Sequence, residues 1–389
     1  MMEGMFMETV CEPNLCNGCN ACVSLCSQNA ITLIDSVEYL NAVIDEALCI
    51  QCNACTSVCP RNNLQYECLN PIEWHQGWAT DDAVRRKSAS GGAASAIMKA
   101  FIAKGGYVCS CTFTEGEFAY YITNNSDEVI RFAGSKYVKS DPQKIYREVK
   151  NHLHNNRAVL FVGLPCHVAA IKNYVGSANQ DLLYTVDLIC HGTPSVNVLK
   201  KYLSDHGYIL EDISDIRFRA KNDFRILKDY KPIVRPGIAD RYLYTFLKKI
   251  NYTENCYECQ FAKTERISDI TVGDSWGSTL PNSEKEKGIS LFLVQTEKGK
   301  RLLEQANLVL EPVDVEKAIN NNGQLKAPAN MPIEREAFMK LFKQNKNFDH
   351  IVFRLAPSVF VKQNIKQILY RLLNVTGRGI TYIIMIRKE

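Results

Sequence analysis

Cysteine spacing is the main chemical signature of the first 60 residues. Two runs share the pattern Cys-x2-Cys-x2-Cys-x3-Cys, and the second lies 33 residues after the first. This is the bacterial type of ligand run for [4Fe-4S] clusters, in which the fourth cysteine of each run binds the other cluster. We therefore expect one cluster on Cys16, Cys19, Cys22 and Cys59, and another on Cys49, Cys52, Cys55 and Cys26.

Zinc is the competing interpretation of these cysteines. Zinc sites commonly take a C-x2-C pair followed by a second, distant pair. A third cysteine two residues later and a fourth after three more are surplus to that pattern. The spacing favours two clusters, which would carry electrons one at a time.

Four further cysteines lie on three separate segments. Cys166 and Cys190 each follow an apolar run that reads as a buried strand, and Cys256 and Cys259 add a C-x2-C pair. Parallel strands end at one edge of a sheet, where open α/β sheets bind their ligands. Four thiols suit a third cluster, a zinc ion or simply buried apolar packing, and the spacing leaves all three open.

The remaining cysteines have no partner set at ligand spacing, and we interpret them as structural or solvent-facing thiols. They are Cys11, Cys68, Cys109 and Cys111. A redox role for Cys109 with Cys111 is the alternative.

A glycine-rich turn is the first candidate for binding an organic cofactor. Ser88-Ala89-Ser90-Gly91-Gly92 precedes a helix expected over 93–104 and follows Arg85-Arg86-Lys87. Glycines let backbone N–H groups approach a ligand, and a helix N-terminus favours phosphate. Ser90 as an ordinary N-cap is the simpler interpretation. No G-x-G-x-x-G fingerprint follows a strand, so the residues alone favour the cap.

A second candidate segment is Asp-Ile-Thr-Val-Gly-Asp-Ser-Trp-Gly over 269–277, which reads as a strand entering a tight loop. Asp274 can bind ribityl or ribose hydroxyls there, or cap the loop. One-electron carriers usually reach organic substrates through a flavin, which converts between single electrons and pairs. A flavin is therefore the cofactor to consider for both segments.

The segments that position these residues alternate between strand and helix after about residue 155. Strands are expected over 158–163, 182–189 and 289–295, and helices over 168–175, 195–203 and 299–306. This alternation predicts an α/β domain with a largely parallel sheet. The preceding cysteine repeat predicts an α+β ferredoxin-like two-cluster module that depends on its clusters for folding. Between them, residues 70–85 are polar and irregular, and we interpret them as a linker.

Composition restricts the class of protein further. The 389 residues are 46% hydrophobic and 23% charged, which is ordinary for a globular protein. Of the sixteen cysteines, eight form the two ligand runs, and no secretory signal is visible at the start; these features predict a cytoplasmic protein, because thiolate ligands need a reducing compartment. The formal charge of +4 would be offset by anionic clusters, so no nucleic-acid partner is expected. No apolar run is long enough for a transmembrane helix.

The C-terminal segment is basic. Residues 350–389 contain seven Lys and Arg and one acidic residue, and Val361, Ile365, Ile368 and Leu372 recur at helical spacing. Such a helix more often packs on its own protein; contact with a membrane surface is the alternative.

Taken in order, these motifs resemble the coenzyme F420 hydrogenase/dehydrogenase beta-subunit family, which includes deazaflavin-reactive subunits of archaeal hydrogenases and formate dehydrogenases. The resemblance runs from Cys16 to about Gly277. Besides the strings above it is carried by Gly134-Ser135-Lys136-Tyr137-Val138, Leu164-Pro165-Cys166, Cys190-His191-Gly192 and Cys256-x2-Cys259. Members hold FAD beside a [4Fe-4S] cluster in an α/β domain.

The resemblance implies roles for particular residues. Cys166, Cys190, Cys256 and Cys259 would bind a third cluster. Ser90, Gly91 and Gly92 would form part of the FAD pocket, to which we add Ser88 and Asp274 as candidate cofactor-binding residues.

Two further residues are candidate catalytic groups. Lys136 would neutralise charge on a reduced flavin or bind its phosphates; a solvated surface lysine is the alternative. His191 would donate a proton near the flavin or hydrogen-bond a cluster sulfur and tune its potential.

One departure concerns Cys26, which is followed by Ser27 where the run usually has a proline, whereas Cys59-Pro60 keeps it. No ligand is lost. No residue reads as specific for deazaflavin, so the resemblance does not identify the substrate.

We thus expect a ferredoxin-type domain over 1–70, the N-terminal part of a flavin domain over 71–155, an iron–sulfur/flavin α/β domain over 156–330 and a basic helical tail over 331–389. The first hypothesis is an oxidoreductase that passes electrons between a ferredoxin-like donor or acceptor, three clusters, FAD and a small molecule. The second is an electron-transfer subunit of a larger redox complex without its own substrate. A third is a domain that has lost its flavin and only binds a partner.

Overall fold

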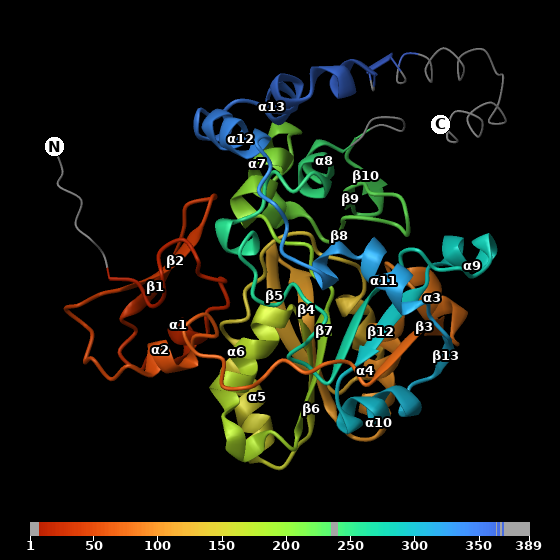
Figure 1. Cartoon of the computed structure of the whole chain (residues 1–389). Coiled ribbons are helices and arrows are strands. Elements are labelled where there is room, and N and C mark those ends of the chain that lie inside the picture. Colours follow the sequence, from red (N-terminus) through yellow and green to blue (C-terminus); the bar gives the residue numbers. More distant parts are fainter. Residues whose placement is uncertain (1–7, 235–239, 363, 366–367, 369–389) are drawn as a thin grey trace.

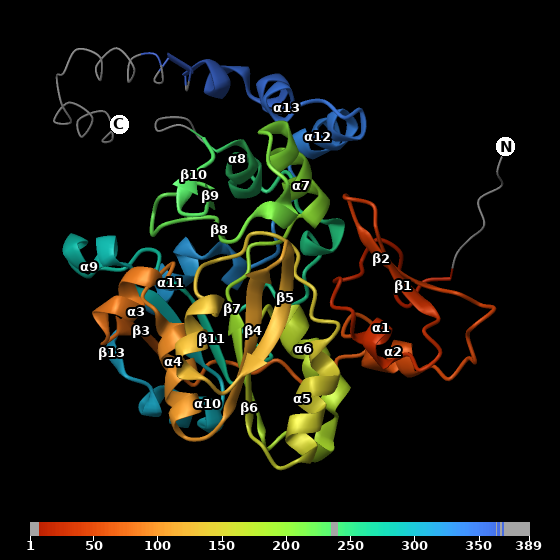
Figure 2. The ribbon, with the colours of Figure 1, turned by 180° about the vertical axis from the view of Figure 1, so that it is seen from behind.

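The structure is a computed structural model that describes residues 8–234, 240–362, 364–365 and 368. A small N-terminal module lies beside a larger part built on an eight-stranded sheet (Figure 1). The view from behind shows the same separation, with helices α5 (Ile145–His154) and α6 (Pro165–Val175) between the module and the sheet (Figure 2).

The N-terminal module repeats one local structure twice. Helices α1 (Ala21–Leu25) and α2 (Ala54–Val58) each begin after an asparagine in the left-handed region, Asn20 with φ 56° and Asn53 with φ 57°. Asparagine tolerates this conformation better than most residues. Strands β1 (Ile31–Asp35) and β2 (Leu40–Ile44) form an antiparallel pair beside the helices.

The large sheet is mixed, with the order β13-β3-β12-β11-β7-β6-β4-β5. The four strands β4, β6, β7 and β11 are parallel, and the outer strands pair antiparallel. The strands are β3 (Glu73–Ala79), β4 (Tyr107–Thr114), β5 (Glu117–Thr123), β6 (Val159–Gly163), β7 (Leu183–Leu188), β11 (Ile270–Asp274), β12 (Ser290–Val294) and β13 (Leu308–Glu311).

The prediction of a largely parallel sheet is therefore wrong for the outer strands. A parallel pair needs a long crossover, whereas a tight turn can join only antiparallel strands. Glu115 and Gly116, with φ 52° and 78°, join β4 to β5 in such a turn. The strand expected over 289–295 is present as β12, but it runs against β11.

Alternating residues of β6 explain why both sheet faces are covered. Val159 and Phe161 pack in the core beneath α5 and α6. Leu160 and Val162 pack in the core beneath α4 (Ala93–Ala103) and α10 (Glu297–Gln305). A strand that is apolar on both faces is typical of the interior of an α/β sheet.

The expected linker over 70–85 is also wrong, because β3 and helix α3 (Asp82–Lys87) form there. β3 is an interior strand between β12 and β13. Its polar Gln76 is buried and donates from Nε2 to the Pro312 carbonyl (2.7 Å), while its Oε1 accepts from Ser275 (3.0 Å). Tertiary hydrogen bonds thus satisfy a polar residue that made the segment look irregular.

A mostly helical lobe, which includes a small three-stranded sheet, covers the carboxyl edge of the large sheet (Figure 1). Apolar residues of four helices form its core, together with Phe118 and Val138. The lobe contains α7 (Val196–Asp205), α8 (Arg241–Leu247), α12 (Glu334–Lys343), α13 (Phe348–Leu355), β8 (Ile216–Arg217), β9 (Leu227–Lys228) and β10 (Lys231–Pro232).

The remaining described elements are short connections. They are α9 (Asn282–Lys287), α11 (Val315–Asn321) and the 3-10 turns η1 (Ser126–Phe132), η2 (Ser177–Asn179), η3 (Leu210–Asp212), η4 (Glu254–Cys256) and η5 (Gly323–Leu325).

The predicted basic tail is described only in part. Residues 357–362 are helical, and Val361, Ile365 and Ile368 are exposed. Leu372 and most of the basic residues lie outside the described residues. No helix in the described ranges is both long and apolar enough to cross a membrane.

Candidate redox site

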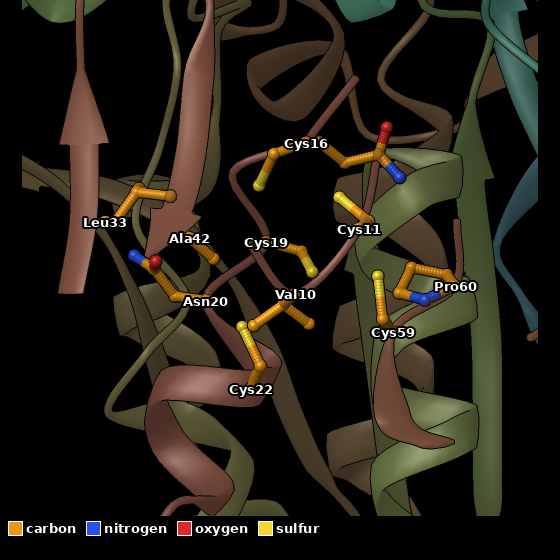
Figure 3. Close-up of a pocket in the computed structure, with 11 residues that line it drawn as sticks. Val10, Cys11, Cys16, Cys19, Asn20, Cys22, Leu33, Ala42, Cys59 and Pro60 are labelled. Carbon is orange, nitrogen blue, oxygen red and sulfur yellow. The ribbon is translucent and has the colours of Figure 1, made fainter. Parts of the chain in front are cut away.

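The first predicted ligand set lies around one small cavity in the N-terminal module (Figure 3). Cys16, Cys19, Cys22 and Cys59 all line it, and all are buried. Three come from the loop and first turn at α1, and Cys59 directly follows α2. The structure therefore places three cysteines of the first run beside the fourth cysteine of the second run, as the spacing predicts.

Backbone amides point at sulfur atoms in equivalent places of the repeat. The N–H of Gly18 donates to Cys16 Sγ and that of Gln51 to Cys49 Sγ, both at 3.4 Å. Gly18 has φ 68° and Gln51 φ 55°, so a left-handed residue turns the amide towards each thiol. Such donors stabilise charged thiolates and tune the potential of a cluster.

The second predicted set is nearer to solvent. Cys26, Cys49 and Cys55 are partly buried and Cys52 is exposed. Cys26 Sγ accepts from the Ala30 N–H at 3.4 Å. In the described ranges, no three or more His, Cys, Asp or Glu side chains converge on the position of a single metal ion.

The third predicted set assembles at the carboxyl edge of the sheet. Cys166 is in the first turn of α6 directly after β6, Cys190 follows β7 by two residues, and Cys256 ends η4. Burial, and after it the neighbouring Cys256 and Cys259, raise the pKa of Cys190 to about 12. The four thiols act electrostatically on one another, so residues of all three segments lie near this edge.

A buried ion pair holds the loop of Cys259 against the strand that leads to Cys190. Arg266 donates to Asp187 Oδ1 at 3.1 Å, and both side chains are almost fully buried. The same guanidinium donates to the carbonyls of Phe261 (2.6 Å) and Leu188 (3.0 Å). Arg266 thus positions ligand candidates from two segments.

Lys139 is a charged residue that the sequence analysis missed. Its ammonium donates to the Asn17 carbonyl at 3.1 Å and to Asn255 Oδ1 at 3.4 Å. Burial lowers the pKa of Lys139, but the surrounding thiolates, foremost Cys256 and Cys166, outweigh burial and raise it overall. Lys139 directly follows the family motif Gly134-Ser135-Lys136-Tyr137-Val138, and this position could have indicated its importance.

Cys11, interpreted above as a structural or solvent-facing thiol, lies beside the first ligand set. It is buried and lines the first cavity together with the four predicted ligands (Figure 3). Its thiol hydrogen-bonds Cys16 and Cys59. The cavity therefore holds five thiols, of which the ligand spacing names four.

A second, much larger cavity of about 620 Å³ opens at the carboxyl edge of the sheet. It lies within the size range of cofactor sites. Six of the seven predicted cofactor-binding and catalytic residues line it, and Cys190 of the third set lines it too. The six are Ser88, Ser90, Gly92, Lys136, His191 and Asp274.

Gly91 is the exception, because it packs against β3 and β12 and does not line the cavity. A Cβ there would lie 2.6 Å from the Gly77 carbonyl oxygen and 2.7 Å from the Ser290 nitrogen, so only glycine fits between β3 and β12. Gly92, with φ 86°, directly precedes α4 and has no side-chain cap. The predicted capping by Ser90 is thus wrong, since Ser90 donates to the Ile289 carbonyl at 2.8 Å.

Asp274 is bound by Arg219, which the sequence analysis also missed. Two guanidinium nitrogens donate to the two carboxylate oxygens at 2.7 and 2.8 Å. Arg219 also donates to the Tyr137 hydroxyl (3.1 Å) and the Ala89 carbonyl (2.7 Å). Its Nε is buried without a partner among the described residues, although Arg219 lines the cavity. The alternating basic residues Arg217, Arg219 and Lys221 were the available signal.

The two predicted catalytic residues face the same cavity. Lys136 donates from Nζ to the Phe132 carbonyl at 2.9 Å, at the end of η1, and burial lowers its pKa. Burial also lowers the pKa of His191, which favours the neutral imidazole at pH 7. Lys136 is therefore not a solvated surface lysine.

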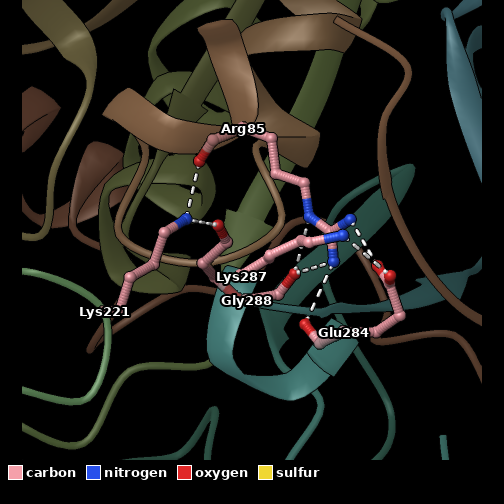
Figure 4. A network of polar contacts seen from close by, with 6 residues as sticks. Arg85, Lys221, Glu284, Lys287 and Gly288 are labelled. Carbon is pink, nitrogen blue, oxygen red and sulfur yellow. Dashed lines mark hydrogen bonds and ion pairs between the residues drawn. The ribbon is translucent and has the colours of Figure 1, made fainter. Parts of the chain in front are cut away.

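Arg85, which precedes the Ser90 turn, does not supply free positive charge to the cavity (Figure 4). It is buried, donates to Glu284 Oε2 at 2.6 Å and to the Gly288 carbonyl, and stacks on Trp78. Lys221 donates to the carbonyls of Arg85 (2.6 Å) and Ser90 (2.7 Å), and burial lowers its pKa to about 8. This network fixes the backbone of the Ser90 turn.

Three family profiles match the chain. The 4Fe-4S dicluster domain matches residues 15–63. The N-terminal and C-terminal parts of the coenzyme F420 hydrogenase/dehydrogenase beta subunit match 74–145 and 156–317, which together are more than half of the chain. Fold and site thus define an iron–sulfur protein with a mixed-sheet α/β domain. The chain belongs to the coenzyme F420 hydrogenase/dehydrogenase beta-subunit family, as its motifs predicted.

Individual relatives are distant. The chain is 24% identical over 243 residues to a protein described as F420-dependent formate dehydrogenase subunit beta from Methanocaldococcus jannaschii, covering 59% of this chain and 58% of the relative. It therefore spans less than two thirds of that relative. A solved structure of the F420-reducing [NiFe] hydrogenase complex from Methanosarcina barkeri matches with a TM-score of 0.45 and 16% identity, over 66% of this chain and 91% of that one.

Proposed function

We propose that this protein is an iron–sulfur flavoprotein oxidoreductase that exchanges electrons between a protein partner and a small molecule. When bound, the clusters would supply one-electron transfer and a flavin would supply conversion to electron pairs. The observation that carries the proposal is Cys190, which lines the large cavity and belongs to the third set of thiols.

The proposed cluster ligands fall into three sets of four. The first set is supported by its shared cavity and by the buried amide donor of Gly18. Buried thiols resist ionisation, so a thiolate set needs positive charge nearby, which iron and Lys139 would both provide. The sets are Cys16, Cys19, Cys22, Cys59; Cys49, Cys52, Cys55, Cys26; and Cys166, Cys190, Cys256, Cys259.

FAD is the proposed occupant of the large cavity. The unpartnered Nε of Arg219 offers a buried donor to a polar ligand, and the N-terminal end of α4 offers backbone N–H groups for phosphate. Tyr137 stacks on Phe246 with ring centroids 4.4 Å apart, and both line the cavity, giving an aromatic wall for a planar ring system.

Lys136 and His191 are the proposed catalytic groups. The Lys136 ammonium would offset negative charge on a reduced cofactor, and the His191 imidazole would hold or deliver a proton. Because the matched relative is described as F420-dependent, this deazaflavin is the first small molecule to assay.

The exposed second set is the proposed contact with an electron-transfer partner. Cys52 is exposed, and the apolar Leu48 and Ile50 beside Cys49 are 50% and 62% exposed. Apolar residues around an accessible cluster suit a transient redox interface. The same observation favours a second candidate function, that of an electron-transfer subunit whose partner in a larger redox complex covers this surface.

Anaerobic purification with iron, sulfide and flavin quantified per chain tests the proposal. We expect about 12 iron atoms from three four-iron clusters, and one FAD released on denaturation. Zinc in place of iron would contradict the cluster assignment, and a colourless supernatant would contradict the flavin. If the isolated chain reduces or oxidises a small molecule, the subunit function without a substrate is wrong.

A further inference from the structure

Lys139 connects the loops of two predicted cluster sites. Its ammonium donates to the backbone oxygen of Asn17, directly after Cys16, at 3.1 Å. It also donates to Oδ1 of Asn255, directly before Cys256, at 3.4 Å. One positive charge therefore lies between the first and the third set of thiols.

The two asparagines close this connection. Asn255 donates from Nδ2 to Asn17 Oδ1 at 3.3 Å, so Lys139, Asn17 and Asn255 form a hydrogen-bonded triangle. Thr253 donates to Asn255 Oδ1 at 2.8 Å and lies 3.7 Å from Cys256 Sγ. The Lys139 backbone N–H donates to the Pro194 carbonyl at 2.9 Å, and this hydrogen bond fixes the backbone position from which the side chain extends.

The charge of Lys139 has no carboxylate partner. Across the described ranges, no Asp or Glu oxygen lies within ion-pair distance of its ammonium, whose two hydrogen-bond acceptors are neutral. The groups that raise its pKa are cysteine thiols, those of Cys256, Cys166, Cys16 and Cys190. A partly buried cation is costly without a counter-charge, so this arrangement points to anionic groups on both sides.

We propose that Lys139 is the shared counter-charge of two iron–sulfur sites, those of the first and third cysteine sets, and that it raises the reduction potentials of both. This inference rests on the proposed function, since it assumes clusters at both sites. Reduction adds one negative charge to a cluster, and a nearby cation stabilises that charge more than the oxidised form.

The shared position has a consequence for the two potentials. Because Lys139 would raise both in the same direction, it would favour reduction of both clusters and change the difference between their potentials little. With clusters bound, one electron would leave one site and enter the other, no bond would form or break, and Lys139 would remain protonated. No cysteine of the second set is among the main electrostatic neighbours of Lys139, so the potential of the second cluster would not depend on this lysine.

Lys139→Met tests the proposal by redox titration of the anaerobic holoprotein with EPR detection. We expect the reduction equilibria of the first and third clusters to become about tenfold less favourable, which is about 59 mV lower for one electron. The second cluster serves as the internal reference. Loss of the corresponding signals in Cys16→Ser and Cys256→Ala variants assigns each cluster, and Lys139→Arg should restore the potentials.

Asn255→Asp tests the same point if Lys139→Met does not load iron. It places a carboxylate beside the ammonium without removing the lysine, and should lower the same two potentials. Lys172→Met is the matched control. Lys172 is also a partly buried lysine that donates to a backbone carbonyl, that of Ile267, but its main charge partners are not predicted ligands.

If Lys139→Met binds a full complement of iron and the potentials do not change, the proposal is wrong and Lys139 is only a structural cross-link. If Lys139→Met does not bind iron, unchanged potentials in Asn255→Asp lead to the same conclusion. An equal shift in the reduction potentials of all three clusters would contradict the proposal that Lys139 acts on the first and third clusters in particular. Failure of the wild-type protein to hold iron would instead contradict the proposed function, so the two failures are distinguishable.

Discussion

Arg219 places two guanidinium nitrogens against the two carboxylate oxygens of Asp274, at 2.7 and 2.8 Å. Arg219 follows β8 and Asp274 ends β11, so the pair ties the helical lobe to the sheet edge beside the large cavity. The Arg219 side chain is 3% exposed and that of Asp274 23% exposed. A planar, bidentate pair of this kind is geometrically specific.

Arg219→Met should therefore destabilise the fold and empty the cavity. Breaking a buried ion pair leaves a carboxylate without its partner, and we expect a loss of about 3 kcal/mol in the free energy of unfolding. Flavin per chain should fall in parallel. Arg217→Met is the matched control, since Arg217 pairs with Asp215 at the surface and its removal should cost less than about 1 kcal/mol. Equal losses in both variants would contradict the role of Arg219.

Arg266→Met should release the third cluster selectively. The buried pair with Asp187 holds the loop of Cys259 to the end of β7, so iron should fall from about 12 to about 8 atoms per chain. Cys256→Ala should give the same iron count and slow reduction of the flavin. Cys68→Ala, a partly buried thiol outside the three sets, should keep all the iron. Unchanged iron in Cys256→Ala would mean that Cys256 is not a ligand.

Gly92→Ala should weaken flavin binding beyond its effect on stability. Alanine at φ 86° costs about 1–2 kcal/mol, and the new methyl would press on Ala79 Cβ at 3.3 Å. Gly105→Ala separates the two effects, because Gly105 has φ 84° and nothing within 4 Å of an added Cβ. Both variants should lower the melting temperature, but only Gly92→Ala should lower the flavin content. A similar flavin loss in both would show that strain alone is responsible.

Ile50→Glu should slow electron exchange with a reduced ferredoxin-type protein by about tenfold, since a charge would disrupt an apolar contact worth about 1.4 kcal/mol. Iron and flavin content should stay unchanged, because Ile50 is 62% exposed. Stopped-flow absorbance of the clusters measures the rate. Ile333→Glu, at a residue 91% exposed near α12, controls for added surface charge. An unaltered rate in Ile50→Glu would place the partner elsewhere.

Local patterns predicted much of the fold and of the candidate site. Apolar runs predicted β6, β7 and β12, and helical spacing predicted α6 and α7, because burial on one or both faces leaves a periodic trace in the sequence. The irregular composition of residues 70–85 concealed β3, since the side-chain amide of Gln76 finds its hydrogen-bond partners in Pro312 and Ser275, which are far away along the chain. The mixed direction of the sheet was missed because strand direction depends on connections, which leave little trace in a strand's own residues.

The sequence by itself determined the two repeated cysteine runs and the membership in the family, because ligand spacing within one loop is set by short-range chain geometry. Only the tertiary structure decided that Lys139 lies between two ligand loops, that Arg219 binds Asp274, and that Cys190 borders the large cavity. Each of these relationships joins segments far apart along the chain. Such contacts depend on burial, charge and packing throughout the fold, so no local sequence pattern predicts them.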